Sequence, residues 1–306
     1  MGLAFLFPGQ AVQFVGMGRD LYEASSAARE VFDLANDVLE TDLKACCFEG
    51  PEEALKQTAV TQPAVFAHSM AAYRILREKG LSPAFVAGHS VGELSALVAA
   101  GVLPLADGFR LVRIRGKAMQ EAGEQRPGAM AAILGLADEE AEAACAASGG
   151  SGVVVAANYN CPGQVVVSGE VDAVARAVEE ARARGAKRAV ELPVSGAFHS
   201  ALMEPAVGAL AEVLEGIPFS AAQVPVVPNV TAEPTQDPEE LKGLLLRQVT
   251  SPVRWTASME RLVADGMDQA LEVGPGNTLQ GLMRRIDRRT TVSAAGTMDE
   301  IGALDD

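Results

Sequence analysis

A short apolar strand runs directly into a helix at residues 85–97, FVAGHSVGELSAL, and the break carries Gly88, Ser90 and Gly92. A sharp strand-to-helix turn brings the backbone too close to its neighbours for a Cβ atom, which explains a glycine on each side of the serine. G-x-S-x-G in this setting indicates a nucleophile elbow, whose helix presents free N–H groups to negative charge. The five residues alone leave a second interpretation open, in which Ser90 is the N-cap of the helix.

Strands and helices alternate along much of the chain. LAFLF (3–7) has the composition of a buried strand ending at a Pro-Gly turn, and helices are predicted over residues 61–80 and 105–123. The pattern resumes in the last third of the chain, with helices over 238–248 and 252–264 and a final strand-turn-helix. This alternation predicts a parallel sheet covered by helices.

The middle of the chain has a different order. Between residues 125 and 194 the hydrophobic pattern predicts β-α-β-β-α-β, which is typical of a ferredoxin-like unit complete in itself. We therefore expect an α/β protein in which a small subdomain at 125–194 is inserted into a larger parallel-sheet domain formed by 1–124 and 195–306.

Charge and hydropathy exclude several classes of partner. The sequence has 25 Lys and Arg against 40 Asp and Glu, a net charge of −15, so its field repels the phosphates of nucleic acids. It has no run of about 20 uncharged apolar residues and no secretory signal, so we expect no membrane partner and a cytoplasmic protein. The four cysteines lack C-x-x-C spacing, which predicts small buried residues rather than a disulfide scaffold or a metal site.

A serine nucleophile needs a base, and the sequence has only three histidines. His89 adjoins Ser90, so strand alternation aims its ring away from the serine. His68 lies within a predicted helix among apolar residues, which favours a structural role. His199 remains, and it follows the serine in the chain as the base does in the α/β-hydrolase order. A backbone carbonyl or a side-chain amide would serve as its orienting partner, because capping explains the aspartates at helix starts: Asp107, Asp138 and Asp172.

Arg115 projects from the apolar stripe of its predicted helix, unlike Arg110, Arg113 and Lys117, which share a solvated face. A guanidinium among apolar residues is costly unless an anion meets it. Either an internal salt bridge, for example to Glu93, or a substrate carboxylate would serve. Arginine's planar fork suits the second role geometrically.

Together these residues describe transfer of an acyl group that carries a free carboxylate. Ser90 would attack a thioester, and His199 would take the proton and return it to the leaving thiol. The elbow rule places one oxyanion donor at the N–H of Val91, and the loop after the first strand offers Gln10 as the second.

The sequence resembles the malonyl-CoA:acyl carrier protein transacylases of fatty acid synthesis, with the acyltransferase domains of polyketide synthases as relatives. The resemblance covers nearly the whole chain in the family's order, and includes FLFPGQ (5–10), TQPAVFA (61–67), AGHSVGELSALVAAGVL (87–103), RGKAMQEA (115–122), LPVSGAFHSALMEPA (192–206), RQVTSPVRW (247–255) and EVGPGNTLQGL (272–282). It implies an α/β-hydrolase-like core over 1–124 and 195–306 with the ferredoxin-like subdomain inserted. Malonyl-CoA is then a substrate, phosphopantetheinylated acyl carrier protein is the partner, no cofactor is needed, and a monomer is the default.

The resemblance also implies roles for individual residues. Ser90 is similar to the acylated nucleophile, His199 to the base, and Arg115 to the clamp for the malonyl carboxylate. The N–H groups of Gln10 and Val91 correspond to the oxyanion hole.

The main-chain carbonyl of Gln248 corresponds to the group that orients the histidine. Gln62, Asn160 and Asn229 match family positions near the site. Phe198 resembles the malonyl-selective form in polyketide acyltransferases, because its ring crowds an α-methyl group, an effect worth roughly 1–3 kcal/mol.

The sequence departs from the family pattern after Gln10, where Ala11 and Val12 replace a glycine and a small residue. This leaves Gln10 as a donor but puts the loop's close approach in question. Two rival functions are a serine hydrolase or thioesterase, against which Arg115 argues, and an inactive docking subunit, against which the intact Ser90, His199 and Arg115 argue. A free-standing polyketide acyltransferase stays open from the sequence. The basic stretch MRRIDRR (283–289), with Lys187 and Arg188, is either a carrier-docking patch or a solvated face.

Overall fold

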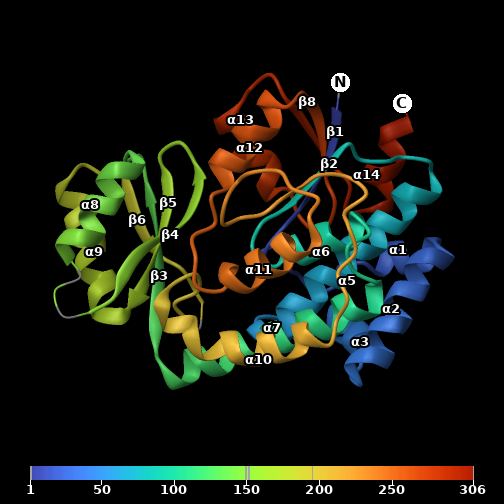
Figure 1. Ribbon diagram of the computed structural model, residues 1–306, viewed down its shortest axis with the longest axis horizontal. Coiled ribbons are helices and arrows are strands. Elements are labelled where there is room, and N and C mark those ends of the chain that lie inside the picture. The colour runs from blue at the N-terminus through green and yellow to red at the C-terminus, as the bar shows by residue number, and fades with distance from the viewer. Residues whose placement is uncertain (1, 149, 151, 195, 306) are drawn as a thin grey trace.

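Five strands form one parallel sheet in the order β7-β2-β1-β8-β9, and Figure 1 labels three of them, β1, β2 and β8. The computed structural model describes residues 2–148, 150, 152–194 and 196–305. The strands of this sheet are β1 (Gly2–Phe7), β2 (Phe85–Gly88), β7 (Val226–Val227), β8 (Met267–Glu272) and β9 (Thr291–Ala294). Because β1 pairs in parallel with both β2 and β8, the carboxyl ends of these strands meet at one edge, where α/β proteins place their ligands.

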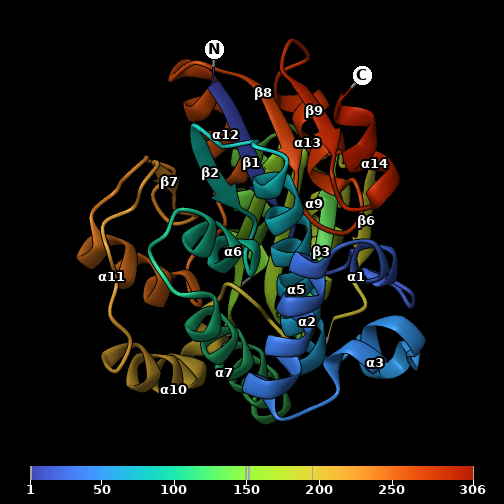
Figure 2. The same ribbon diagram turned by 90° about the vertical axis from the view of Figure 1, so that its right-hand side faces the viewer.

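Different helices cover the two faces of this sheet, because successive side chains of a strand point to opposite faces. Phe5 and Phe7 belong to the apolar cluster that includes α5 (Thr58–Glu78) and α7 (Leu105–Gln125). Figure 2 shows α2, α5 and α7 side by side on this face. Ala4 and Leu6 belong to the cluster on the other face, with α12 (Trp255–Ala264) and α13 (Thr278–Ile286).

A second, antiparallel sheet has the order β4-β5-β3-β6 and lies beside the first (Figure 1). Its elements are β3 (Gly128–Leu134), α8 (Asp138–Ser148), β4 (Val154–Cys161), β5 (Gln164–Glu170), α9 (Val171–Ala183) and β6 (Arg188–Glu191). A separate apolar cluster joins the two helices to one face of this sheet. The ferredoxin-like β-α-β-β-α-β order predicted from the sequence is confirmed.

The first helices of the chain were not predicted from the sequence. They are α1 (Arg19–Ala24), α2 (Ser26–Leu39), α3 (Leu43–Glu49) and α4 (Glu52–Leu55). Helix α2 begins at the N-cap Ser25, whose side chain accepts a hydrogen bond from the N–H of Ala28, and it buries one apolar face against α5. The remaining helices are α6 (Gly92–Ala99), α10 (Glu204–Glu215), α11 (Pro238–Gln248), α14 (Met298–Gly302) and the short 3₁₀ turns Ala201–Met203 and Ala303–Asp305.

Most predicted boundaries shift by a few residues. The helix predicted over 61–80 begins at Thr58 and contains Pro63, and the helix predicted over 252–264 begins at Trp255. The first residue of each of these helices is hard to predict from the sequence, because neither helix has a side-chain N-cap.

Throughout the described part of the chain, no helix has the length and apolar character needed to cross a membrane.

Candidate active site

Ser90 occupies the turn between β2 and α6 with a φ of 52°, in the left-handed region that residues other than glycine rarely adopt. The glycines beside it are required by close packing. A Cβ on Gly88 would lie 2.0 Å from the carbonyl oxygen of Gly92, and one on Gly92 would lie 2.2 Å from the carbonyl oxygen of Phe7. The sharp strand-to-helix turn predicted from G-x-S-x-G is therefore present, and Ser90 is not the side-chain N-cap of α6.

His199 lies against the serine although 109 residues separate them. Its Nε2 is 2.8 Å from Ser90 Oγ, and its Nδ1 is 2.9 Å from the main-chain oxygen of Gln248 and 3.1 Å from that of Ser251. Both partners of Nδ1 are carbonyls, so Nδ1 carries the proton and Nε2 presents a lone pair to the serine hydroxyl. The geometry is that of a nucleophile and base with a carbonyl as third member.

Burial and the positive charge of Arg115 lower the pKa of His199 to about 3. The carbonyls of Gln248 and Ser251 act against this shift by accepting hydrogen bonds from the ring. The imidazole is therefore neutral at physiological pH, as a group that must accept a proton from Ser90 requires.

The other two histidines have different surroundings. His68 is buried in α5 with Nε2 2.7 Å from the main-chain oxygen of Gly296, which confirms its packed structural position. His89 turns its Nε2 to the Oδ1 of Asn160, 2.8 Å away, and its ring centroid lies 5.5 Å from that of Trp255. Burial lowers the pKa of both imidazoles.

Arg115 is fully buried in α7 and points at the serine. Its Nη2 lies 3.2 Å from Ser90 Oγ and 2.8 Å from Gln248 Oε1, and its Nη1 lies 2.6 Å from Gln62 Oε1. Every one of these acceptors is neutral, and Nε has no hydrogen-bond partner. Burial lowers the pKa of Arg115 to about 10, so the guanidinium keeps its charge at neutral pH.

The internal salt bridge that the sequence left open for Arg115 is absent: among the residues the structure describes, no carboxylate forms an ion pair with its guanidinium. Glu93 is buried nearby on α6, but one of its oxygens accepts a hydrogen bond from the main-chain N–H of Asn229, 2.7 Å away. Burial raises the pKa of Glu93 to about 7, and the bond from Asn229 and the charge of Arg115 oppose the rise.

The loop after β1 brings Gln10 to the same site. Its Oε1 accepts a hydrogen bond from Gln62 Nε2 at 2.9 Å. Ala11 has a φ of 73°, a left-handed conformation that costs an L-residue about 1–2 kcal/mol and that the glycine common in the family would adopt freely. Ala11 is exposed and its N–H donates to Gln13 Oε1, so the loop keeps its approach to the site despite the substitution.

A cavity of about 250 Å³ opens above the serine, between the parallel sheet and the antiparallel sheet. Predicted site residues that line it are Gln10, Ser90, Asn160, Phe198 and His199. The others, Gln62, Val91, Arg115 and Gln248, are buried without lining it. Several further lining residues come from β3, β5 and α13 and have no sequence signal that marks them as site residues: Met130, Gln164, Val166, Leu279 and Leu282.

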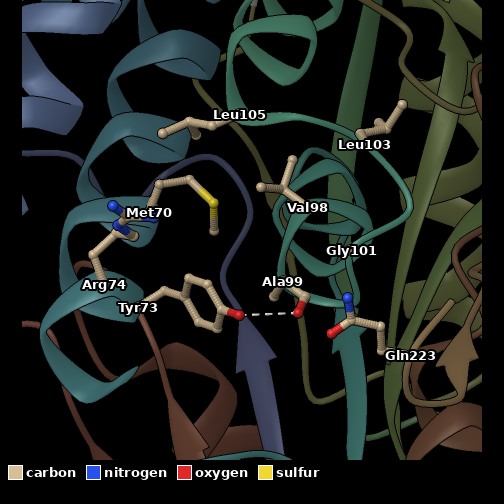
Figure 3. A pocket seen from close by; sticks show the side chains of 9 residues that line it. All are labelled: Met70, Tyr73, Arg74, Val98, Ala99, Gly101, Leu103, Leu105 and Gln223. Atoms are coloured by element: carbon tan, nitrogen blue, oxygen red, sulfur yellow. Dashed lines mark hydrogen bonds between the residues drawn. The ribbon is translucent and has the colours of Figure 1, made fainter. Parts of the chain in front are cut away.

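A second cavity of about 250 Å³ lies between α5 and α6 and contains none of the predicted site residues (Figure 3). Its polar lining residues include Tyr73, Arg74 and Gln223, and the hydroxyl of Tyr73 donates to the main-chain oxygen of Ala99 at 3.0 Å. Three cysteines are buried and Cys46 is half-buried, and burial raises the pKa of Cys47 to about 12. Within the described ranges, no three His, Cys, Asp or Glu side chains are grouped to hold a metal ion.

The chain is similar to known proteins over almost its full length. A family model described as the acyl transferase domain matches residues 4–300. A malonyl CoA-acyl carrier protein transacylase of Bacillus subtilis is 45% identical and aligns over 98% of this chain and 95% of its own. One of Escherichia coli K12 is 47% identical over 95% of this chain and 94% of its own.

The chain is also similar in structure to solved proteins over almost its full length. An acyl carrier protein S-malonyltransferase of Vibrio cholerae superimposes with a TM-score of 0.96 at 44% identity, covering 99% of this chain and 100% of that one. A malonyl-transacylase solved in complex with a type II PKS acyl-carrier protein gives a TM-score of 0.96 at 45% identity, covering 100% and 99%. The chain therefore belongs to the acyl transferase domain family, and within it to the malonyl CoA-acyl carrier protein transacylases.

Proposed function

We propose that the protein transfers the malonyl group of malonyl-CoA to the phosphopantetheine thiol of an acyl carrier protein, through a malonyl ester on Ser90. The observation that carries this proposal is the buried cation of Arg115, which has no carboxylate partner among the described residues and lies 3.2 Å from Ser90 Oγ. A buried guanidinium that is bound only to neutral acceptors gains a charge-assisted hydrogen bond when an anion reaches it, and the free carboxylate of a malonyl group is such an anion.

In the first half-reaction, Ser90 Oγ attacks the thioester carbonyl while its proton passes to Nε2 of His199. The carbonyl electrons move to oxygen, and the N–H groups of Gln10 and Val91 stabilise this oxyanion. The carbonyl then re-forms, the carbon–sulfur bond breaks, and coenzyme A leaves with the proton from His199. The carbonyl of Gln248 holds the imidazole in the tautomer that this transfer requires.

The second half-reaction reverses these steps with a different thiol. Nε2 of His199 takes the proton of the phosphopantetheine thiol, the thiolate attacks the malonyl ester, and Ser90 recovers its proton as the ester bond breaks. The chemistry at the thiol is the same for carriers of fatty acid and of polyketide assembly, so the proposal covers both. The proposed reaction requires no cofactor. We place it in the cytoplasm, where the thiols of coenzyme A and of the carrier stay reduced.

The competing function is hydrolysis, in which the same Ser90 and His199 act but water, instead of a carrier thiol, accepts the acyl group. Mixing the protein with malonyl-CoA and a phosphopantetheinylated carrier protein separates the two, if malonyl-carrier and free malonate are measured in the same samples. We expect malonyl-carrier to account for nearly all coenzyme A released. Release of malonate at the same rate with and without the carrier would identify a hydrolase instead.

A further inference from the structure

Ser90 is held in a conformation that it would not adopt by itself. Its left-handed backbone costs about 1–2 kcal/mol relative to an ordinary turn, and such strain persists only where surrounding contacts over-determine it. Gly88 and Gly92 make the turn sterically possible, and the N–H of Gly92 donates to the main-chain oxygen of His89 at 3.0 Å, but neither glycine bonds to Ser90 itself. The groups that bond directly to the backbone of Ser90 therefore determine whether its Oγ reaches His199.

Asn229 spans this turn with its side-chain amide. Its Nδ2 donates to the main-chain oxygen of Gly88 at 2.7 Å, and its Oδ1 accepts the main-chain N–H of Ser90, also at 2.7 Å. The amide group is planar and rigid, so these two bonds set the separation and direction of the two backbone groups that enclose the turn. The side chain thus bridges the elbow from a segment 139 residues further along the chain.

Asn229 is itself fixed. It is 1% exposed, its N–H donates to Glu93 Oε2 at 2.7 Å, and its main-chain oxygen accepts the N–H of Arg254 at 3.0 Å. Glu93 lies on the first turn of α6, and its own N–H donates to the main-chain oxygen of Ser90 at 3.0 Å. Ser90, Glu93 and Asn229 therefore form a closed ring of hydrogen bonds around the elbow.

The ring also controls an oxyanion donor. The main-chain oxygen of Ser90 accepts bonds from Glu93 N–H and from Gln248 Nε2, the latter at 3.1 Å. Because a trans peptide is planar, its C=O and N–H point in opposite directions, so fixing the oxygen of Ser90 fixes the direction of the N–H of Val91. Rotation of this peptide would move the serine and the donor together.

We propose that Asn229 is a positioning residue for acyl transfer, which holds Ser90 in its left-handed conformation. Glu93 fixes Asn229 in turn by accepting a hydrogen bond from the main-chain N–H of Asn229. Neither side chain touches the reacting atoms: they act through Ser90 and the peptide it shares with Val91. This inference rests on the proposed function, because its readout is acylation of Ser90 by malonyl-CoA.

The test is the single-turnover rate of Ser90 malonylation, measured on the folded fraction of each variant. Asn229→Ala removes both bonds to the elbow, and we expect the rate to fall about 100-fold, the cost of misplacing a reacting group by about 1 Å. The KM for malonyl-CoA should change less than about threefold, because substrate binding depends on other groups. A rate within threefold of wild type would overturn the inference and leave Asn229 a structural residue.

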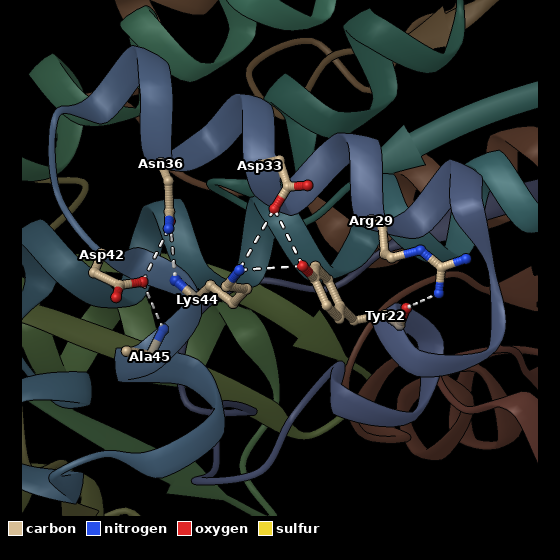
Figure 4. Close-up of polar contacts among 7 residues, drawn as sticks. All are labelled: Tyr22, Arg29, Asp33, Asn36, Asp42, Lys44 and Ala45. Atoms are coloured by element: carbon tan, nitrogen blue, oxygen red, sulfur yellow. Dashed lines mark hydrogen bonds and ion pairs between the residues drawn. The ribbon is translucent and has the colours of Figure 1, made fainter.

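Asn36 provides the matched control. It too bridges two segments, with Nδ2 donating to Asp42 Oδ1 at 2.9 Å and Oδ1 accepting the N–H of Lys44 at 3.1 Å (Figure 4). Asn36→Ala should lower thermal stability and leave the acylation rate unchanged. If wild type and Asn36→Ala both fail to acylate, the proposed function has failed; if both acylate and Asn229→Ala matches them, only this inference has failed.

Asn229→Asp gives a second readout that does not depend on Asn229→Ala being folded. A protonated aspartic acid can donate to Gly88 and accept from Ser90, whereas the carboxylate cannot donate. The acylation rate of Asn229→Asp should therefore rise as pH falls, relative to wild type, and a profile parallel to wild type would contradict the proposal. Glu93→Gln keeps an acceptor for the N–H of Asn229 and should retain the rate that Glu93→Ala loses.

Discussion

The side-chain oxygen of Gln248 accepts a hydrogen bond from Arg115 at 2.8 Å, while the main-chain oxygen of the same glutamine accepts one from His199 at 2.9 Å. One residue therefore holds both the cation that would meet the substrate carboxylate and the base that would activate the serine. Gln248 is the last residue of α11 and is fully buried, so neither contact depends on a mobile surface loop. Gln248 therefore links Arg115, which would select the acyl group, to His199, the base of the catalytic pair.

The first prediction concerns selection of the acyl group. Arg115→Gln keeps a polar side chain but shortens it and removes the positive charge, and a hydrogen bond to a charged group is worth about 1.5–3 kcal/mol. We expect kcat/KM for malonyl-CoA to fall about 10- to 100-fold while that for acetyl-CoA falls much less. Arg113→Gln, on the exposed face of the same helix, is the control and should change neither. An equal loss for both substrates would contradict a carboxylate clamp.

The second prediction concerns pH. The folded pKa of His199 lies below its ordinary value of 6.5, so the imidazole stays neutral as pH falls through 6.5 and remains able to accept a proton. We expect kcat/KM for malonyl-CoA to lose less than about twofold between pH 7.5 and 5.5, where an ordinary histidine would cost about tenfold. Arg115→Gln removes the charge that helps to lower this pKa, and its acid limb should move to higher pH. An acid limb near pH 6.5 in wild type would contradict the assignment.

Much of the site could be predicted from the sequence because its parts have local signals. The nucleophile elbow is a motif of consecutive residues, and elimination among the three histidines identifies His199 as the candidate base. Arg115 stood out because its helical neighbours are apolar. Gln248 could not be found this way: its contacts to Arg115 and Ser90 span 133 and 158 residues, and a buried glutamine at a helix end has no distinctive pattern.

For the fold as well, elements with a clear local hydrophobic pattern could be predicted and elements without one could not. Strands β1 and β2 and the ferredoxin-like order were predicted from hydrophobic patterns, and membership of the transacylase family confirms the resemblance drawn from the motifs. Helices α1 to α4, helix α14 and strand β9 were not predicted. Strand β9 has only four residues and one buried side chain, so its identity depends on pairing with β8 rather than on its own sequence.

The third prediction concerns the α-substituent of the acyl group. Phe198 is buried beside His199 and lines the cavity. Phe198→Ala should increase the ratio of methylmalonyl-CoA to malonyl-CoA use by about tenfold, within the 1–3 kcal/mol that one apolar contact provides. Both substrates are measured on the same preparation, so any loss of folded protein cancels in the ratio. Phe219→Ala, outside the cavity, should leave the ratio unchanged, and no change in Phe198→Ala would remove this residue from selectivity.

The fourth prediction concerns carrier docking. Arg285 binds Gln164 Oε1 and the main-chain oxygen of Pro162, so replacing it disturbs a hairpin that lines the cavity. Arg284 is exposed, and its side chain donates a hydrogen bond to Gln280 Oε1 of its own helix at 3.2 Å, which makes Arg284→Glu the cleaner test. We expect the KM for the carrier to rise about three- to tenfold, with a reduced salt dependence, and that for malonyl-CoA to stay constant.

Arg74→Glu is the control for this docking surface, because Arg74 is exposed on α5 beside the second cavity. It should change neither KM. Equal changes in the two KM values of Arg284→Glu would discard the basic stretch as a docking site.

The central claim is that Ser90 carries the malonyl group, and the mass of the intact protein tests it most directly. Wild type and Ser90→Ala are each mixed with malonyl-CoA, and the protein mass is recorded before any carrier is added. We predict that wild type gains the mass of one malonyl group, that Ser90→Ala gains none, and that the added mass disappears when a phosphopantetheinylated carrier is supplied. A malonyl adduct on Ser90→Ala, or none on wild type, would contradict the account.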